Sequence, residues 1–353
     1  MKSMTSTKVQ VDVRNFELED IKEWILSVGE PKFRAKQIFE WLWKKRAVSF
    51  DEMTNLSHAL REKLAEHFII RPIVLDIYQK SSDGTIKCRF VLHDGFKIES
   101  VLIPVEKDNR YTVCVSSQVG CSLSCKFCAT GQMKRMRNLD AGEIYDQYVL
   151  INEICQETYD HPLTNVVYMG MGEPLLNYKN TMRSIELLTA PYSLNMAPRR
   201  ITISTVGIAK MITRLADANT GINLAISLHA ADDVKRNDIM PINETNNLQT
   251  VMDSLRYFYN TTKGRISYEY IAFKDFNDTI EDANKLAALC KYFPVRINVI
   301  EYNPIPGVTF VKSNTDTLDI FARHLKKKGI MMTVRRSRGK DIDAACGQLA
   351  NQE

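Results

Sequence analysis

The sequence lacks any long apolar run. No segment of the 353 residues approaches the roughly eighteen uncharged apolar residues that indicate a membrane-spanning helix. Residues 1–10 are polar and lack the apolar core of a signal peptide. We therefore predict neither a membrane span nor a signal peptide.

The sequence also lacks a strong excess of charge of one sign. Its 47 basic and 42 acidic residues leave a net charge of +5, which identifies no class of partner. Apolar residues make up 44% of the chain and charged residues 25%, an ordinary globular composition. The length is sufficient for one large domain and a smaller one.

Eight cysteines are present, and three of them fall in one short motif. This distribution favours metal or redox chemistry in a reducing cytoplasm over a disulfide scaffold. The motif is CxxxCxxC, formed by Cys121, Cys125 and Cys128. A four-iron cluster normally takes four thiolates. Three thiolates from one loop would leave one iron open to a small molecule that chelates it.

Two other uses of this motif fit less well. A structural zinc site would require four nitrogen or sulfur ligands, and a matching second CxxC pair is absent from the sequence. A ferredoxin-like site would require a fourth cysteine, and Cys114, upstream in a predicted strand, fits the loop poorly. Phe127, between two of the motif cysteines, either belongs to the core or packs against the molecule held by the open iron.

A small helical domain is predicted over residues 1–72. Residues 16–28 carry apolar residues at helical spacing, and residues 34–45 and 57–68 are predicted as a second and a third helix. All three tryptophans lie here, and we interpret them as core residues rather than as platforms for stacking bases: Trp24, Trp41 and Trp43.

A β-hairpin is predicted next, within residues 73–106. Residues 85–93 and 96–103 have an extended, β-rich composition, and Asp94-Gly95 between them is a turn signal. Glu99 lies in the second strand. A lone carboxylate in a strand usually faces solvent, so the residue pattern alone assigns no function to Glu99.

Alternating strands and helices are predicted over residues 107–330, followed by a C-terminal segment, residues 331–353. Six repeats predict an α/β fold, a partial (β/α)6 barrel of the TIM type, with active groups at the carboxyl ends of the strands. The predicted strands are residues 112–117, 165–169, 200–204, 223–228, 266–272 and 296–301. Helices are predicted between them, for example over residues 141–156, 178–188 and 280–292.

Basic residues gather in three clusters. For each cluster, contact with phosphate backbones and a solvated helix face are both compatible with the pattern. The third cluster runs directly into the segment that contains Cys346. The clusters comprise Lys32, Arg34, Lys36, Lys44, Lys45 and Arg46; Lys134, Arg135 and Arg137; and Arg323, Lys326, Lys327, Lys328, Arg335, Arg336, Arg338 and Lys340.

The cysteine loop carries a family resemblance. Its CxxxCxΦC form, with the aromatic Phe127 before the last cysteine, resembles the signature of the radical S-adenosylmethionine (SAM) superfamily. The resemblance covers nearly the whole chain and is strongest to the RlmN branch of the RlmN/Cfr family of RNA methyltransferases. The segments that carry it are residues 31–35, 114–121, 169–177, 227–229 and 341–349.

The resemblance implies two cofactors. Cys121, Cys125 and Cys128 would bind a [4Fe-4S] cluster whose free iron takes the amino and carboxylate groups of SAM. Gly172 and Glu173 would contact SAM, since a carboxylate suits its ammonium group. The rest of SAM would be held by Ser204, Ser227, Leu228, His229 and Asn303. On the residue pattern alone, these five positions fit caps, turns and strand ends equally well.

The resemblance also implies a reaction. Cys346 would accept a methyl group on sulfur from one SAM, and a 5'-deoxyadenosyl radical from a second SAM would take a hydrogen atom from that methyl group. Carbon 2 of adenine is electron-poor, so a carbon radical must add to it. Glu99 would accept the proton from carbon 2, and Cys114, as a thiolate, would attack the Cys346 sulfur and form a transient disulfide. From the residues alone, either cysteine fits a buried apolar thiol.

The substrates follow from the resemblance alone. RlmN-type enzymes methylate carbon 2 of an adenosine in 23S rRNA near the peptidyl-transferase centre, and of adenosine 37, immediately 3' of the anticodon, in certain tRNAs. Such bases must be unstacked to enter the site. We expect an electron donor such as flavodoxin, a monomeric enzyme, and RNA contacts from the helical domain and from the basic residues near Cys346.

Two alternatives stay open. A Cfr-type enzyme shares the cluster and both cysteines but modifies carbon 8, and residues 172–177 and 337–340 favour the carbon 2 branch. A non-enzymatic iron-sulfur module that binds RNA would not depend on Cys346. In an enzyme, Cys346 must reach both a methyl donor and an RNA base, which predicts a flexible C-terminal segment.

Overall fold

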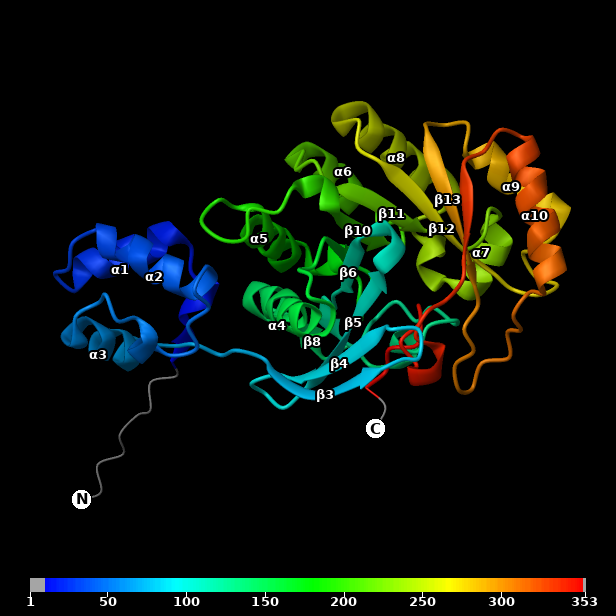
Figure 1. Cartoon of the computed structure of the whole chain (residues 1–353). Helices are drawn as coiled ribbons and strands as arrows, with labels where there is room; N and C mark the ends of the chain where they lie inside the picture. The colour runs from blue at the N-terminus through cyan, green and yellow to red at the C-terminus, as the bar shows by residue number, and fades with distance from the viewer. Residues whose placement is uncertain (1–9, 352–353) are drawn as a thin grey trace, which may run out of the picture.

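The computed structural model describes residues 10–351, which form a curved ten-stranded sheet with helices along its outer face and a small helical lobe beside it (Figure 1). The lobe lies at one end of the molecule, and the C-terminal tail lies against the sheet (Figure 1). Across residues 10–351, every helix is too short or too polar to cross a membrane.

The helical lobe contains the three predicted helices, α1 (Leu18–Ser27), α2 (Phe33–Trp43) and α3 (His58–His67). Trp43 is fully buried in the core, as predicted. The lobe is not all-helical, however, because β1 (Val11–Asp12) pairs in parallel with β2 (Phe68–Ile69). Strands of two residues are too short to produce an alternating pattern that the sequence would reveal.

Buried polar contacts join the lobe to α4 (Ala141–Tyr159) of the barrel. Arg14 Nη1 lies 2.8 Å from Asp146 Oδ2. The Tyr145 hydroxyl donates to the Trp43 carbonyl over 2.5 Å. These contacts fix the position of the lobe relative to the barrel.

The predicted hairpin is confirmed. Strands β4 (Ile86–Val91) and β5 (Lys97–Val105) pair antiparallel around the predicted turn. The hairpin is not a separate extension, because β5 also pairs with β6 (Arg110–Cys114), the first strand of the barrel. In this register Cys114 lies opposite Val101, so the hairpin places Glu99 close to Cys114 along the adjacent strand.

One strand beyond the hairpin was missed. β3 (Val74–Lys80) pairs with β4 and forms the edge of the ten-stranded sheet. All seven of its residues are exposed. An edge strand without a buried face lacks the alternation by which sequence predicts strands.

Seven parallel strands form the barrel. In sheet order they are β6, β9 (Asn165–Tyr168), β10 (Ile201–Thr205), β11 (Asn223–Ser227), β12 (Ile266–Ala272), β13 (Val295–Glu301) and β14 (Met332–Arg335). All six predicted strands are present, and the α/β, TIM-type architecture is confirmed. The seventh, β14, was predicted to belong to the C-terminal segment. The ends of the sheet, β14 and β3, do not pair with each other, so the barrel is partial.

Helices cover the outer face of the sheet (Figure 1). The predicted helices over residues 141–156, 178–188 and 280–292 correspond to α4, α5 and α9. After α4, the helices are α5 (Tyr178–Thr189), α6 (Ala209–Ala218), α7 (Asp233–Ile239), α8 (Leu248–Thr262), α9 (Ile280–Leu289) and α10 (Thr315–Lys327). Short 3-10 helices occupy connections: η1 (Val13–Asn15), η2 (Phe50–Glu52), η3 (Glu106–Asp108), η4 (Thr130–Gln132), η5 (Pro174–Asn177), η6 (Pro198–Arg200), η7 (Pro241–Glu244) and η8 (Lys340–Ile342).

A two-stranded clip encloses the cysteine loop. β7 (Gln118–Val119) pairs antiparallel with β8 (Arg137–Asn138), so the loop leaves and returns at one point. Gly120 begins the loop, and a Cβ atom there would lie 2.2 Å from the Lys134 carbonyl oxygen. Only glycine therefore fits where the two ends of the loop approach each other.

Candidate active site

One cavity lies at the carboxyl ends of the barrel strands, where the strand pattern predicted active groups. Nine of the predicted site residues line it, contributed by the cysteine loop, by the ends of β10 and β11, by the segments that follow β9 and β11, and by the C-terminal tail. They are Cys121, Cys125, Cys128, Gly172, Glu173, Ser204, Ser227, His229 and Cys346. Glu99, Cys114, Leu228 and Asn303 lie around this cavity without lining it.

The cysteine loop separates its polar residues from its cysteines. Ser122, Ser124 and Lys126 are exposed, whereas the cysteines between them face the cavity. Burial raises the pKa of Cys121 to about 11, and the neighbouring Cys128 raises it further. Free thiolates are therefore disfavoured in this loop, and positively charged irons would stabilise them.

The donor set fits an iron-sulfur cluster better than a single ion. Within residues 10–351, no three His, Cys, Asp or Glu side chains converge on a position for one metal ion. Three thiols spread around one cavity instead suit a four-iron cluster, because each thiolate binds a different iron. The loop offers three such ligands and leaves room for a fourth ligand that is not a cysteine.

Glu173 is held in the cavity wall by backbone hydrogen bonds. Its Oε1 accepts from the Leu175 amide over 2.9 Å and its Oε2 accepts from the Val206 amide over 3.0 Å. Burial raises the pKa of Glu173 to about 7. A nearby ammonium group would offset this burial, which fits the predicted contact with SAM. Gly172 has a φ of +92°, and a Cβ atom there would lie 2.5 Å from Gln118 Cβ.

His229 follows β11 and packs against the cysteine loop. Its backbone is left-handed, with a φ of +54°. Its Nδ1 accepts from the Ile271 amide over 3.1 Å, so the neutral ring carries its proton on Nε2. Burial lowers the pKa of His229 to about 3. The Phe127 ring lies 4.6 Å from the His229 ring, so Phe127 is both buried and part of the cavity wall.

Arg236, which sequence reasoning missed, ties the strand ends together. It is fully buried on α7 and donates to the carbonyl oxygens of Leu228 (3.1 Å), Val206 (2.5 Å) and Ser227 (3.3 Å). Leu228 points into the core and takes part through its backbone. An arginine in a polar seven-residue helix gives no sequence signal of such burial.

A charged pair, Glu269 and Arg335, also lines the cavity; sequence reasoning missed Glu269, whereas Arg335 belongs to the third basic cluster. Arg335 Nη1 lies 3.6 Å from Glu269 Oε2. Glu269 Oε1 accepts from Ser267 Oγ (2.9 Å) and Asn298 Nδ2 (2.8 Å), whereas the buried Oε2 accepts no hydrogen bond. The available sequence signal was an acidic residue between two tyrosines of an otherwise buried strand.

The C-terminal tail brings Cys346 to the cavity. The Ala129 amide donates to the Gly347 carbonyl over 2.7 Å, and Thr130 Oγ1 donates to the Leu349 carbonyl over 2.6 Å. Asn303 Nδ2 donates to the Cys346 carbonyl over 3.2 Å. Asn303 therefore contacts the tail, and the tail is bonded to the loop that would hold the cluster.

The tail also covers Glu99. Glu99 Oε2 accepts from the amides of Ala350 (2.9 Å) and Asn351 (3.1 Å). Glu99 is buried and does not reach the cavity in this arrangement. The expectation that a lone strand carboxylate faces solvent is therefore wrong, because this strand lies within the sheet and the tail covers its end.

Cys114 ends β6 and is buried. Burial raises its pKa, and the nearby Cys346 raises it further. All eight cysteines lie within the described residues and all are free thiols, so the structure contains no permanent disulfide. The disulfide between Cys114 and Cys346 stays a prediction for a transient step.

A partial barrel with a three-cysteine loop after its first strand defines a radical SAM enzyme. Residues 115–287 match the family model described as the radical SAM superfamily, whose members use a [4Fe-4S] cluster and SAM. Residues 11–70 match the model described as the ribosomal RNA large subunit methyltransferase N-terminal domain.

Full-length relatives define the family within this class. A probable dual-specificity RNA methyltransferase RlmN from Cytophaga hutchinsonii is 53% identical over 99% of this chain and 95% of that protein. A protein of the same description from Bacillus subtilis is 42% identical, over 100% of this chain and 98% of that protein. The crystal structure of a radical SAM methyltransferase from Sphaerobacter thermophilus is 38% identical and covers 97% of this chain and 100% of that chain, with a TM-score of 0.90. The chain belongs to the RlmN family of radical SAM RNA methyltransferases.

Proposed function

We propose that this enzyme methylates carbon 2 of an adenosine in 23S rRNA, in the peptidyl-transferase region, and of adenosine 37 in tRNAs. The description of its relatives as dual-specificity RNA methyltransferases supports two RNA substrates. Their RlmN designation favours carbon 2, and nothing in the comparisons favours a Cfr-type modification of carbon 8. The proposal rests on the position of Cys346, which lines the same cavity as the three motif cysteines.

The cavity supports a role for its residues in binding both cofactors. Cys121, Cys125 and Cys128 would hold the cluster, which when bound supplies the electron that cleaves SAM to methionine and a 5'-deoxyadenosyl radical. The buried Glu173 carboxylate would bind the SAM ammonium group. The cavity residues Gly172, Ser204, Ser227 and His229 would hold the rest of SAM, together with the backbone of Leu228 and, at the tail, Asn303.

Cys346 carries the transferred carbon atom. One SAM methylates its sulfur, and the loss of a hydrogen atom from that methyl group leaves a carbon radical that adds to carbon 2 of adenine. Each turnover therefore consumes two molecules of SAM. The exposed side chain of Cys346 and its place on the tail support access to both partners.

Glu99 accepts the proton that carbon 2 loses, and the one electron that the adduct radical must also lose would return to the oxidised cluster. Two tail amides now cover its carboxylate, so the tail must move before an adenine can reach it. Cys346 lies on the same tail as those amides. A single movement of the tail would therefore carry the methylene group toward the base and uncover the proton acceptor.

Cys114 releases the product. As a thiolate it attacks the Cys346 sulfur, which forms an S–S bond and breaks the bond between that sulfur and the methylene carbon. The electron pair of the broken bond stays with the carbon, which becomes the methyl group after protonation. A thiol or dithiol reductant then returns the disulfide to two thiols. Burial raises the pKa of Cys114 and the Cys346 charge raises it further, which supports the two sulfurs being neighbours.

The experiment that tests the proposed function compares Cys346→Ala with a matched control, Cys155→Ala. Cys155 is buried on α4, outside the cavity. Cys346→Ala should retain the cluster absorbance and reductive SAM cleavage but lose all RNA methylation, and Cys155→Ala should retain methylation. Methylation by Cys346→Ala would contradict the mechanism. Mass analysis of the nucleoside as 2-methyladenosine or 8-methyladenosine distinguishes the two positions.

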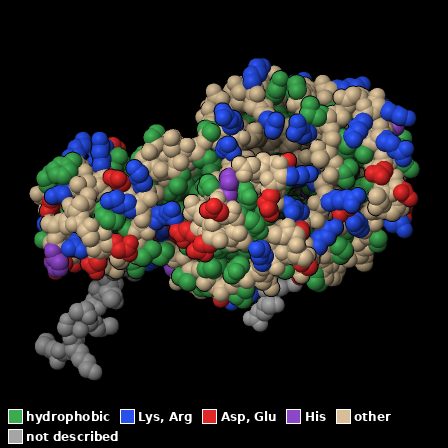
Figure 2. Space-filling model, in the orientation of Figure 1, with side chains coloured by type: hydrophobic (Ala, Val, Ile, Leu, Met, Phe, Trp, Pro, Cys, Tyr) green, Lys and Arg blue, Asp and Glu red, His purple; other side chains and the backbone are tan. Residues whose placement is uncertain are grey.

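The partners are also part of the proposal. Lys and Arg side chains are numerous on the face of the barrel in Figure 2, which supports contact with RNA there and from α2 of the helical lobe. We expect an electron donor such as flavodoxin, a monomer, and a cytoplasmic location, which the eight free thiols support. Anaerobic reduction of the cluster by flavodoxin and the mass of the enzyme in solution test the first two expectations.

A further inference from the structure

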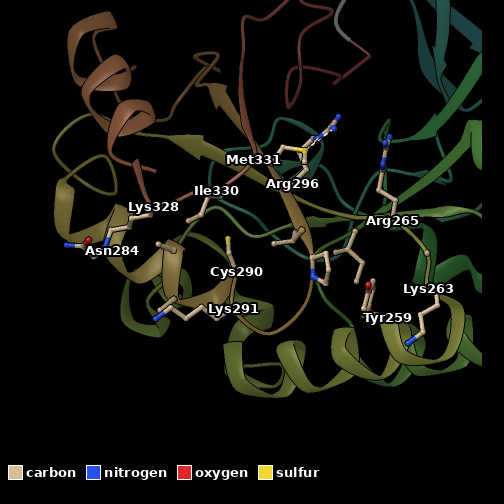
Figure 3. Close-up of a pocket in the computed structure, with 17 residues that line it drawn as sticks. Tyr259, Lys263, Arg265, Asn284, Cys290, Lys291, Arg296, Lys328, Ile330 and Met331 are labelled. Atoms are coloured by element: carbon tan, nitrogen blue, oxygen red, sulfur yellow. Dashed lines mark hydrogen bonds between the residues drawn. The ribbon is translucent and has the colours of Figure 1, made fainter. Parts of the chain in front are cut away.

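A second cleft, drawn in Figure 3, lies at the amino ends of the last barrel strands, whereas the active-site cavity lies at the carboxyl ends. Its volume is about 840 Å³. It is lined by the segments that lead into β12, β13 and β14 and by α9. None of the residues assigned to the reaction lines it. A cleft of this size is large enough for a nucleotide unit.

Five cations surround this cleft and no acidic residue lines it. They are Lys263, Arg265, Lys291, Arg296 and Lys328. Among residues 10–351, no carboxylate forms a salt bridge with any of the five. In Figure 3, Lys291 and Lys328 lie on one side of the cleft and Lys263 and Arg265 on the other. We call this set the basic cleft.

Neutral partners orient two of these cations without cancelling their charge. Arg296 Nε and Nη2 lie 3.2 and 3.0 Å from the Met331 sulfur. Lys263 Nζ lies 5.2 Å from the centre of the Tyr259 ring. Both side chains therefore retain a full positive charge that can bind an anion.

The C-terminal ends of helices carry a partial negative charge, and lysines are commonly found there because they offset it. Helices α8, α9 and α10 all end at this cleft, and each contributes about −0.5 elementary charge. Three ends therefore amount to about −1.5 against five full positive charges. The cleft keeps a net positive charge, so stabilisation of the helix ends does not account for all five cations.

Apolar residues also line the basic cleft. Ile266 is buried, and Val295 and Ile330 are half-buried. Cys290 projects into the cleft (Figure 3), and burial raises the pKa of that thiol to about 12, so the sulfur is neutral. Cations beside apolar lining residues suit a phosphate ester attached to a sugar or a base.

We propose that the basic cleft binds the phosphodiester backbone of the RNA substrate, at a point remote from the target adenosine. The proposal rests on the RNA methyltransferase activity. Ile266 and Arg296 line the cleft, and Glu269 and Ile300 on the same two strands line the active site, so three to four residues at about 3.3 Å each, about 10–13 Å of strand, separate the two sites. Folded rRNA and tRNA extend further than that, whereas a short stem-loop bound at the active site does not need to reach the cleft.

The test compares two charge-reversed variants with the same change in net charge. Lys263→Glu with Arg265→Glu alters the basic cleft, and Lys107→Glu with Arg199→Glu alters exposed residues beside the amino ends of β6 and β10, outside the cleft. Fluorescence anisotropy measures the Kd for full-length tRNA at several salt concentrations. The cleft variant should bind tRNA at least tenfold more weakly, with a salt slope reduced by about 2, because two phosphate contacts are lost. The control should bind tRNA within twofold of the wild type.

Further measurements separate this proposal from the proposed function. Methylation of an anticodon stem-loop to 2-methyladenosine should be unchanged in the cleft variant. Lys291→Gln with Lys328→Gln, on the opposite rim, should weaken tRNA binding in the same direction. Equal Kd values and salt slopes in the cleft and control variants overturn the proposal. Binding of AMP in the cleft with unchanged tRNA affinity also overturns it, whereas a wrong methyl position contradicts only the proposed function.

Discussion

The Glu99 carboxylate lies 3.7 Å from the Lys87 ammonium group inside the sheet, where both side chains are buried. The two residues occupy neighbouring strands, β5 and β4, in diagonal positions of the ladder. The tail amides of Ala350 and Asn351 bind the other oxygen of the same carboxylate. Glu99 therefore has one partner in the sheet and two on the tail, and the proposed tail movement would remove those two.

The Lys87→Met variant tests the fixed partner. Removal of one member of a buried ion pair leaves an uncompensated charge and costs about 3–5 kcal/mol. We expect a lower free energy of unfolding in urea and slower loss of the carbon 2 proton in single-turnover assays. Adding Glu99→Gln should recover part of the stability but none of the activity. A Lys87→Met protein as stable and as active as the wild type would contradict the pair's role.

The Gly172→Ala variant tests the close approach beside Glu173. Its Cβ atom would lie 2.5 Å from Gln118 Cβ at a left-handed φ of +92°, so the segment must shift. We expect reductive SAM cleavage to fall at least tenfold. Gly307→Ala is the matched control, because its φ of +75° imposes strain but no atom lies within 4 Å of the added Cβ. It should cost about 1–2 kcal/mol of stability and leave SAM cleavage intact.

His229 makes stability depend on pH. Burial and the Arg236 cation lower its pKa to about 3, while an unfolded histidine titrates near 6.5. Below pH 6.5 the unfolded chain therefore binds a proton that the folded chain does not, and stability falls by about 1.4 kcal/mol per pH unit toward pH 3. His229→Gln should lose this component between pH 7.5 and 5.5 in urea denaturation, and exposed His58→Gln should not. Identical slopes in His229→Gln and the wild type would refute the assignment.

The release step should accelerate as pH rises. Burial raises the pKa of Cys114, so its thiol is protonated at neutral pH and only a small fraction is the reactive thiolate. That fraction increases about tenfold per pH unit below the pKa. Single-turnover release of RNA from the Cys346 adduct should therefore accelerate between pH 7.0 and 8.5. Cys114→Ala should keep the adduct at every pH, and release that does not vary with pH would exclude Cys114 as the attacking group.

Much of the barrel was predictable because its signals are local. Six strands and the helices between them appear as alternating apolar segments, and Cys121, Cys125 and Cys128 are ligands within one loop. The missed elements have no such local signal. β3 is fully exposed and has no buried face that would impose alternation, whereas β14 does alternate, with Met332 buried and Thr333 and Arg335 exposed, but its four residues are too few for the pattern to stand out.

The missed site residues have the same explanation. Arg236 and Glu269 are charged residues that become buried only because the ends of several strands converge on them. Their hydrogen-bond partners, such as Leu228 for Arg236 and Asn298 for Glu269, lie on neighbouring segments of the barrel. A single sequence shows which residues are charged, but it does not show how close they lie to their partners in the fold.

The sequence by itself determined the chemistry that one loop can support, because the spacing of three cysteines restricts which cluster they bind. Only the tertiary structure decided which distant groups act with that loop. The tail places Cys346 at the cavity and covers Glu99, and β6 and β5 bring Cys114 and Glu99 to the same part of the sheet. The reason is physical: bonded neighbours limit a loop's geometry directly, whereas contacts between distant segments depend on the packing of the whole sheet and tail.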